Sequence, residues 1–170
     1  MKKIAKKFDL KRFTFVFFTC VAVVFIILRA PQNISATEIL EFNRDPKNYN
    51  AKLSIVDEGD KNVAEFLVAS AKTKESKMYG LMNLDKLPEN FGMLFEFEEN
   101  QVIAMWMKNT RISLDMIFID ENDVIVSIET LAKPYSLDII SSQKEARKVL
   151  EINGGLVEKF GIEVGQRVKY

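Results

Sequence analysis

Four polar residues interrupt an apolar part of the sequence, and their types suit the binding of a small molecule. Lys108, Asn109 and Thr110 directly follow the apolar run Val102–Met107, and Asp115 lies within the next apolar run. Lysine can bind an anionic group, and amide and hydroxyl groups can orient a ligand through hydrogen bonds. Asp115 could act as a base if burial raised its pKa. Its alternative role is structural, as an acceptor of backbone hydrogen bonds at a tight bend.

Glu151 is a further candidate for the same site, because it lies between Leu150 and Ile152 in an apolar stretch. Two other glutamates have simpler explanations. Glu75 fits an exposed helix face, and Glu145 completes the capping-box pattern that begins at Ser142.

Six methionines between positions 78 and 116 suggest a second type of chemistry, because thioether sulfur is a soft ligand suited to Cu(I). Most of them fall on apolar stripes, where methionine fills gaps in a core, so core packing is the favoured interpretation. The same holds for Trp106, whose alternative role is an aromatic platform for a sugar. The methionines are Met78, Met82, Met93, Met105, Met107 and Met116.

The residue types that are absent exclude several enzyme classes. The chain has no histidine, and its one cysteine, Cys20, lies in the N-terminal apolar run. The rest of the chain therefore cannot form a Ser-His-Asp triad, a cysteine nucleophile, an ordinary zinc site or a disulfide. Residues 37–170 carry a net charge of −6, which argues against a nucleic-acid partner. We expect no metal and no cofactor.

The N-terminus has the pattern of an export segment. A basic stretch precedes the uncharged run Phe13–Leu28, so residues 1–36 are predicted to be a signal peptide or an uncleaved signal anchor. The preceding Lys and Arg residues place the rest of the chain on the extracytoplasmic side, periplasmic or at the cell surface. Any membrane contact is expected through this segment alone. Residues 37–52 are predicted to be a linker, because Pro46 lies within them and Pro31 lies shortly before them.

The remaining residues, 53–170, predict a single domain of the α+β class, mostly β, with a barrel-like shape and two or three short helices. The capping box at Ser142 predicts a helix whose apolar stripe contains Ala146, Val149 and Leu150. A turn is expected at 98–101. The other predicted helices are Thr73–Met82 and Leu156–Phe160, and the predicted strands are Leu53–Val56, Val63–Ser70, Met93–Phe97, a strand from Val102, Leu114–Ile119, Val124–Ile128 and Gln166–Tyr170.

Several short motifs, in order and over residues 63–170, resemble the prokaryotic domain of unknown function 192. The resemblance implies a compact, β-rich, barrel-like domain that often follows an export signal, and it implies no activity and no catalytic residues. Two positions depart from the family pattern, where Leu84 replaces a common Arg and Ser113 a common Pro. The motifs are Gly80-Leu81-Met82, Leu87-Pro88, Gly92-Met93-Leu94-Phe95, Trp106-Met107-Lys108-Asn109-Thr110, Leu114-Asp115, Phe118-Ile119-Asp120, and Val149-Leu150-Glu151 with Gly154.

These observations lead to one main functional hypothesis and two alternatives. We expect a non-enzymatic extracytoplasmic module that binds a small polar ligand, or an envelope partner, around Lys108–Thr110. The first alternative is a hydrolase that uses Asp115 with Lys108, and the second is a methionine-based copper site.

Overall fold

The computed structural model describes residues 35–170. The predicted export segment therefore lies almost wholly outside the described residues, together with its apolar run. Within residues 35–170, no helix combines the length and the apolar character that a membrane crossing needs.

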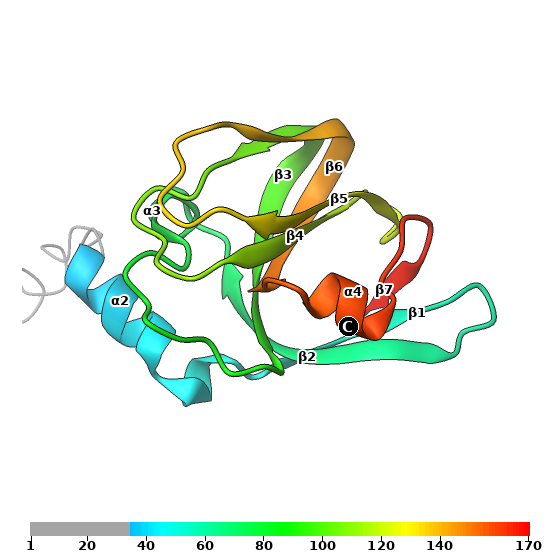
Figure 1. The fold of residues 1–170 in the computed structure, drawn as a ribbon, viewed down its shortest axis with the longest axis horizontal. Coiled ribbons are helices and arrows are strands. Elements are labelled where there is room, and N and C mark those ends of the chain that lie inside the picture. The colour runs from blue at the N-terminus through cyan, green and yellow to red at the C-terminus, as the bar shows by residue number, and fades with distance from the viewer. Residues whose placement is uncertain (1–34) are drawn as a thin grey trace, which may run out of the picture. The chain divides into compact units, whose positions relative to one another are not determined.

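A seven-stranded sheet with the strand order β5-β4-β6-β3-β2-β1-β7 forms the framework (Figure 1). Every pairing is antiparallel except that of β2 with β3. The sheet coils into a half-barrel, so the α+β, mainly β class is confirmed. The strands are β1 Ala51–Val56, β2 Asn62–Ala71, β3 Phe91–Met105, β4 Leu114–Ile119, β5 Ile125–Ala132, β6 Ile140–Asn153 and β7 Arg167–Lys169.

The two edges of the half-barrel approach each other at one end. The amide of Ile125 at the start of β5 donates to the carbonyl of Gln166 at 2.9 Å, and the amide of Val168 in β7 donates to the carbonyl of Asp123 at 2.8 Å. These bonds satisfy backbone groups that would otherwise remain exposed on two edge strands.

The described residues also form short helices, some of which begin at a capping side chain. They are α2 Ala36–Arg44, the 3-10 turn η2 Pro46–Asn48, α3 Lys74–Tyr79 and α4 Leu156–Phe160. Ser35 and Thr73 cap α2 and α3 with their hydroxyl groups. The prediction of α4 is confirmed, including the left-handed cap at Gly161, whose φ is 69°.

All six residues of strand β4 are buried, and the strand lies between two apolar clusters. Side chains alternate along a strand, so Met116 and Phe118 join one cluster while Ile117 and Ile119 join the other. The core therefore lies on both sides of the sheet, as expected for a strand that is apolar on both faces.

The predicted helix at Ser142 is wrong, because residues 140–153 form strand β6. The Ser142 hydroxyl accepts a hydrogen bond from the Ile103 amide at 2.9 Å, where the pairing of β3 with β6 is irregular. The apolar spacing of Ala146, Val149 and Leu150 fits a helix, but it also fits a strand that is buried on both faces. This segment is a strand rather than a helix because it pairs with β3 and β4, which are distant in the sequence.

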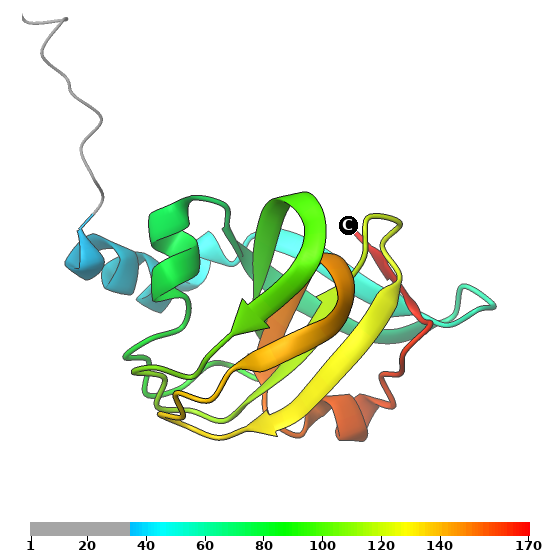
Figure 2. The ribbon, with the colours of Figure 1, turned by 90° about the horizontal axis from the view of Figure 1, so that it is seen from above.

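One other expectation, the turn at residues 98–101, differs from the structure. Residues 98–101 form no turn but an irregular stretch within the long strand β3, which coils together with β6 (Figure 2). The predicted linker 37–52 contains α2, η2 and the start of β1. Ile39 and Tyr49 are buried there, which shows that this segment packs against the domain.

Candidate functional site

A pocket of about 270 Å³ lies beside the polar residues that the sequence singled out. Its walls come from the crossover between β2 and β3, from strand β3 and from the segment after it. One residue of β6 completes it. The lining residues are Lys77, Met78, Tyr79, Gly80, Leu81, Met82, Phe95, Phe97, Ala104, Met105, Trp106, Lys108, Thr110 and Glu151.

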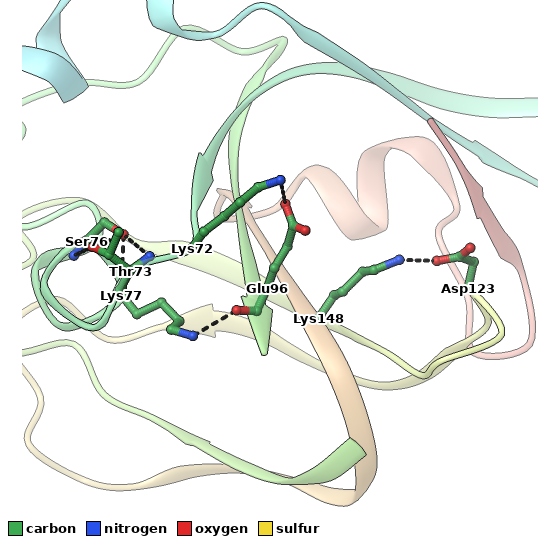
Figure 3. A network of polar contacts seen from close by, with 7 residues as sticks. All are labelled: Lys72, Thr73, Ser76, Lys77, Glu96, Asp123 and Lys148. Carbon is green, nitrogen blue, oxygen red and sulfur yellow. Dashed lines mark hydrogen bonds and ion pairs between the residues drawn. The ribbon is translucent and has the colours of Figure 1, made fainter. Parts of the chain in front are cut away.

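The crossover wall exists because β2 and β3 are parallel, and parallel neighbours cannot be joined by a tight turn. Helix α3 occupies this connection and is attached to β3 by polar contacts (Figure 3). The ammonium group of Lys77 donates to the carbonyl of Glu96 at 2.9 Å, and Lys72 forms an ion pair with the carboxylate of Glu96 at 3.1 Å. These contacts hold residues 77–82 beside β3.

Gly80 allows the crossover to lie close to the ring of Phe95. Its φ is +50°, and a Cβ at this position would lie 3.1 Å from Phe95 Cζ. The side-chain amide of Asn43 in α2 donates to the carbonyl of Gly80 at 2.5 Å. The glycine therefore ends α3 and lets another element pack against the backbone, as its place within the predicted helix suggested.

Glu151 is the unusual group in this pocket. Its residue is only 4% exposed, yet its carboxylate accepts no hydrogen bond and forms no ion pair with any residue between 35 and 170. Burial raises its pKa from the ordinary 4.5 to about 8. In the empty pocket burial therefore favours the protonated, neutral form of Glu151, which can donate as well as accept a hydrogen bond, and a cation bound beside the carboxyl group would favour its ionised form.

Lys108 and Thr110 reach the same pocket from the segment after β3. The ammonium group of Lys108 lies 5.1 Å from the centre of the Trp106 ring and forms no ion pair with residues 35–170. Thr110 is 5% exposed, and its hydroxyl donates one long hydrogen bond, 3.4 Å, to the carbonyl of Lys108 and makes no other side-chain hydrogen bond with residues 35–170. Both side chains have hydrogen-bonding capacity left for a ligand.

Asn109 does not line the pocket. It is exposed, and its φ of 56° places it in the left-handed region of a tight turn. Its side-chain amide lies 3.9 Å from the sulfur of Met82, a residue of the pocket wall. Asn109 therefore stabilises the turn and does not itself line the pocket.

Asp115 has the structural role that the sequence left open, and it does not line the pocket. It is fully buried, and its two carboxylate oxygens accept from the amides of Leu131 and Val157, each at 2.8 Å. In the pairing of β4 with β6, Asp115 lies opposite Ile152 and the next residue lies opposite Glu151. The two carboxylates therefore point to opposite faces of the sheet.

The expected core position of Trp106 is wrong, because its side chain is 44% exposed and lines the pocket. The methionines divide into two groups. Met93, Met107 and Met116 are buried in the core, as expected. The other three, Met78, Met82 and Met105, line the pocket. Residues 35–170 contain no cluster of three or more Asp, Glu, Cys or His side chains that could hold a metal ion.

Comparison with known proteins finds one matching family model. The family model for domain of unknown function 192 (DUF192), described as an uncharacterized ACR, matches residues 55–170. No curated protein matches the chain.

Two solved structures have a similar fold. One, from Sinorhizobium meliloti 1021, is described as a candidate transcription regulator; it is 33% identical, with a TM-score of 0.67, and the match covers 69% of this chain and 91% of that chain. The other, a protein of unknown function from Novosphingobium aromaticivorans DSM 12444, is 29% identical, with a TM-score of 0.67, and the match covers 71% of this chain and 84% of that chain.

Proposed function

Because the chain belongs to the uncharacterized DUF192 family, we propose a function from its own pocket: a non-enzymatic module that binds a small polar ligand beside Glu151. The observation that carries this proposal is the buried carboxylate of Glu151, which has no partner among residues 35–170. The carboxyl oxygens of Glu151 are not fully enclosed by protein, so they face the pocket, where a ligand can reach them. A ligand that donates a hydrogen bond or a positive charge would give Glu151 the partner that residues 35–170 do not supply.

The rest of the pocket supports binding rather than reaction. Lys108 and Thr110 offer hydrogen-bond donors, while Phe95, Met105 and Trp106 give an apolar surface. Small-molecule sites commonly combine apolar walls with a few polar groups that fix orientation.

A thermal-shift screen of the full-length chain against sugars, amino acids, short peptides and metal ions tests the proposal. A ligand at 100 times its dissociation constant should stabilise the protein by about 2.7 kcal/mol. Glu151→Gln should abolish the shift, and Glu145→Gln, on an exposed part of the same strand, should keep it. Failure of every compound, or an equal shift in both variants, would refute the proposal.

The hydrolase alternative lacks the arrangement that it requires. Asp115 would have to face the pocket that Lys108 lines, but both of its oxygens are bound to backbone amides on the other face of the sheet. We therefore do not propose this reaction.

A copper site is a second candidate, favoured by the three methionines that line the pocket. Thioether ligands suit Cu(I), and Ag(I) is a redox-inert substitute for it in a titration. Met82→Leu and Met105→Leu should each weaken Ag(I) binding, whereas Met93→Leu in the core should not. Equal Ag(I) affinity in all three variants would exclude this candidate.

Nucleic acid is not a partner that we propose, although one similar structure is described as a candidate transcription regulator. Residues 35–170 carry 17 Lys and Arg against 23 Asp and Glu, a net charge of −6. Binding to nucleic acid depends mainly on the neutralisation of phosphates by basic side chains.

We also propose an extracytoplasmic location, with an envelope protein as the alternative partner. The support is the basic N-terminus followed by the uncharged run Phe13–Leu28. A reporter active only outside the cytoplasm, fused to the C-terminus, should be active. Activity of only a cytoplasmic reporter in the same fusion would refute this location.

A further inference from the structure

We propose that the ligand is a small zwitterion of the amino-acid class, with an ammonium group that binds Glu151, an acidic group that binds Lys108, and a short apolar body between them. This inference rests on the proposed function and names its ligand class. It follows from the ammonium group of Lys108 and the carboxyl group of Glu151, which share a pocket and form no ion pair with each other; Glu151 becomes ionised when the ammonium group of a ligand binds beside it.

The separation of the two groups is the first step. Lys108 and Glu151 both line the pocket, yet no ion pair within 4.0 Å joins them. The ammonium group of Lys108 lies over the Trp106 ring, 5.1 Å from its centre. Glu151 is held in β6 between β3 and β4, where it pairs with Met93 and Met116. Neither group is therefore paired with the other, and both line the pocket that a ligand would enter.

Lys77, the other cation of the pocket, does not bind Glu151 in place of a ligand. The ammonium group of Lys77 donates to the carbonyl of Glu96 and lies 4.8 Å from the centre of the Phe97 ring. It forms no ion pair with Glu151. Glu151 therefore needs a positive or hydrogen-bond-donating group from elsewhere.

Ligands with a single charge fit this pocket less well. An amine without an acidic group would meet Glu151 but would bring a positive charge near Lys77 and Lys108. A carboxylate without an amine would meet Lys108 but would leave Glu151 without a cation. A zwitterion satisfies both ends, because each charge has an opposite partner and none is left desolvated and unpaired.

The walls and the size limit the middle of the ligand. Met82, Phe95 and Met105 give the same pocket an apolar surface. The pocket volume of about 270 Å³ lies just below the roughly 300–1,000 Å³ of drug-sized ligand sites. The ligand is therefore small, with a linear or aromatic apolar side chain.

Calorimetric titration of the full-length chain with a matched ligand series tests the inference. Norleucine, methionine and phenylalanine carry both charges, pentylamine carries only the amine, hexanoate carries only the acid, and hexanol carries neither. At least one amino acid should bind roughly tenfold or more tighter than each of the other three probes.

Two variants assign the charges to their partners. Glu151→Gln should remove the advantage of the amino acid over hexanoate, and Lys108→Gln should remove its advantage over pentylamine. The matched controls Glu145→Gln and Lys133→Gln, both at exposed positions, should retain the wild-type order of affinities.

The inference and the function beneath it fail in different ways. If hexanol or an uncharged sugar binds at least as tightly as the amino acids, and Glu151→Gln weakens that binding, the zwitterion inference is overturned and the binding function stands. If no compound of this series or of the wider screen binds, both are overturned.

Discussion

Two buried carboxylates on adjacent strands show how their neighbours determine what each one does. Asp115 receives two backbone amides and holds the start of α4 and the residue Leu131 in place. Glu151 receives none from residues 35–170 and faces a pocket. The residue types are nearly the same, so the difference in role comes from the hydrogen bonds.

The first prediction concerns the pH dependence of stability. Between pH 4.5 and about 8, folded Glu151 keeps a proton that the unfolded chain has released, so the free energy of unfolding falls as pH rises through this range. The side chain introduced by Glu151→Gln does not titrate, so the variant does not lose this part of the free energy of unfolding. Chemical denaturation should show equal stability of variant and wild type near pH 4, and an advantage for the variant near pH 9 of up to about 5 kcal/mol. Parallel pH profiles would contradict this.

The second prediction separates a structural carboxylate from a functional one. Asp115→Ala leaves one buried amide, of Val157, and one partly buried amide, of Leu131, without acceptors, so the free energy of unfolding should fall by about 2–4 kcal/mol. Asp138→Ala, at an exposed position, is the control and should change stability by less than about 1 kcal/mol. Ligand affinity of the folded Asp115 variant should stay unchanged, because Asp115 lies on the other face of the sheet.

Among elements, the pairing of β3 with β6 positions the floor of the pocket. Gly92 in β3 lies close to β6, and a Cβ at this position would lie 2.9 Å from the carbonyl oxygen of Glu151. The third prediction is that Gly92→Ala lowers stability by about 1–3 kcal/mol and weakens ligand binding, because the strands must separate at Glu151.

Denaturation and titration of the same samples test this prediction. Gly59→Ala is the control, since the nearest atom to its Cβ would be Asp57 Oδ1 at 3.4 Å, an ordinary contact distance. A Gly92 variant with wild-type stability would show that the strands are not closely packed there.

Local patterns in the sequence predicted the elements whose signals are local. The helix Leu156–Phe160 with its glycine cap and the strand Leu114–Ile119 are both present. The capping-box pattern at Ser142 misled because its hydroxyl bonds to an amide 39 residues away. Long-range pairing of this kind overrides local propensity and leaves no mark in a short window of sequence.

The candidate site was predictable to a similar extent. Lys108, Thr110 and Glu151 were selected from residue type and apolar context, and all three line one pocket. Lys77, Phe95 and the exposed position of Trp106 were not predicted. Their place in the pocket depends on the crossover between two parallel strands, and sequence periodicity does not specify which elements such a crossover contacts.

At the scale of the whole molecule, the short strand β7 joins two distant parts of the half-barrel. It pairs with β1, and it bonds to the residues just before β5. Val168 at its centre is 3% exposed and belongs to one of the two apolar clusters. The closure of the sheet at this end therefore depends on the last residues of the chain.

The fourth prediction tests this closure. Val168→Ala should lower the free energy of unfolding by about 1–3 kcal/mol, because it removes buried methyl groups and leaves a cavity. Val164→Ala is the control at a position that is 54% exposed, and it should change stability by less than about 0.5 kcal/mol. Equal stability of the two variants in urea would show that β7 adds little to the fold.

The crossover between β2 and β3 also has a consequence for which parts of the pocket tolerate substitution. It supplies the wall of the pocket from Lys77 to Met82, while the floor at Glu151 belongs to a central strand of the sheet. Substitutions in a surface connection disturb a fold less than substitutions in a central strand. Substitutions between Lys77 and Met82 should therefore reshape the pocket wall at little cost to the fold, whereas a substitution at Glu151 acts on the sheet itself.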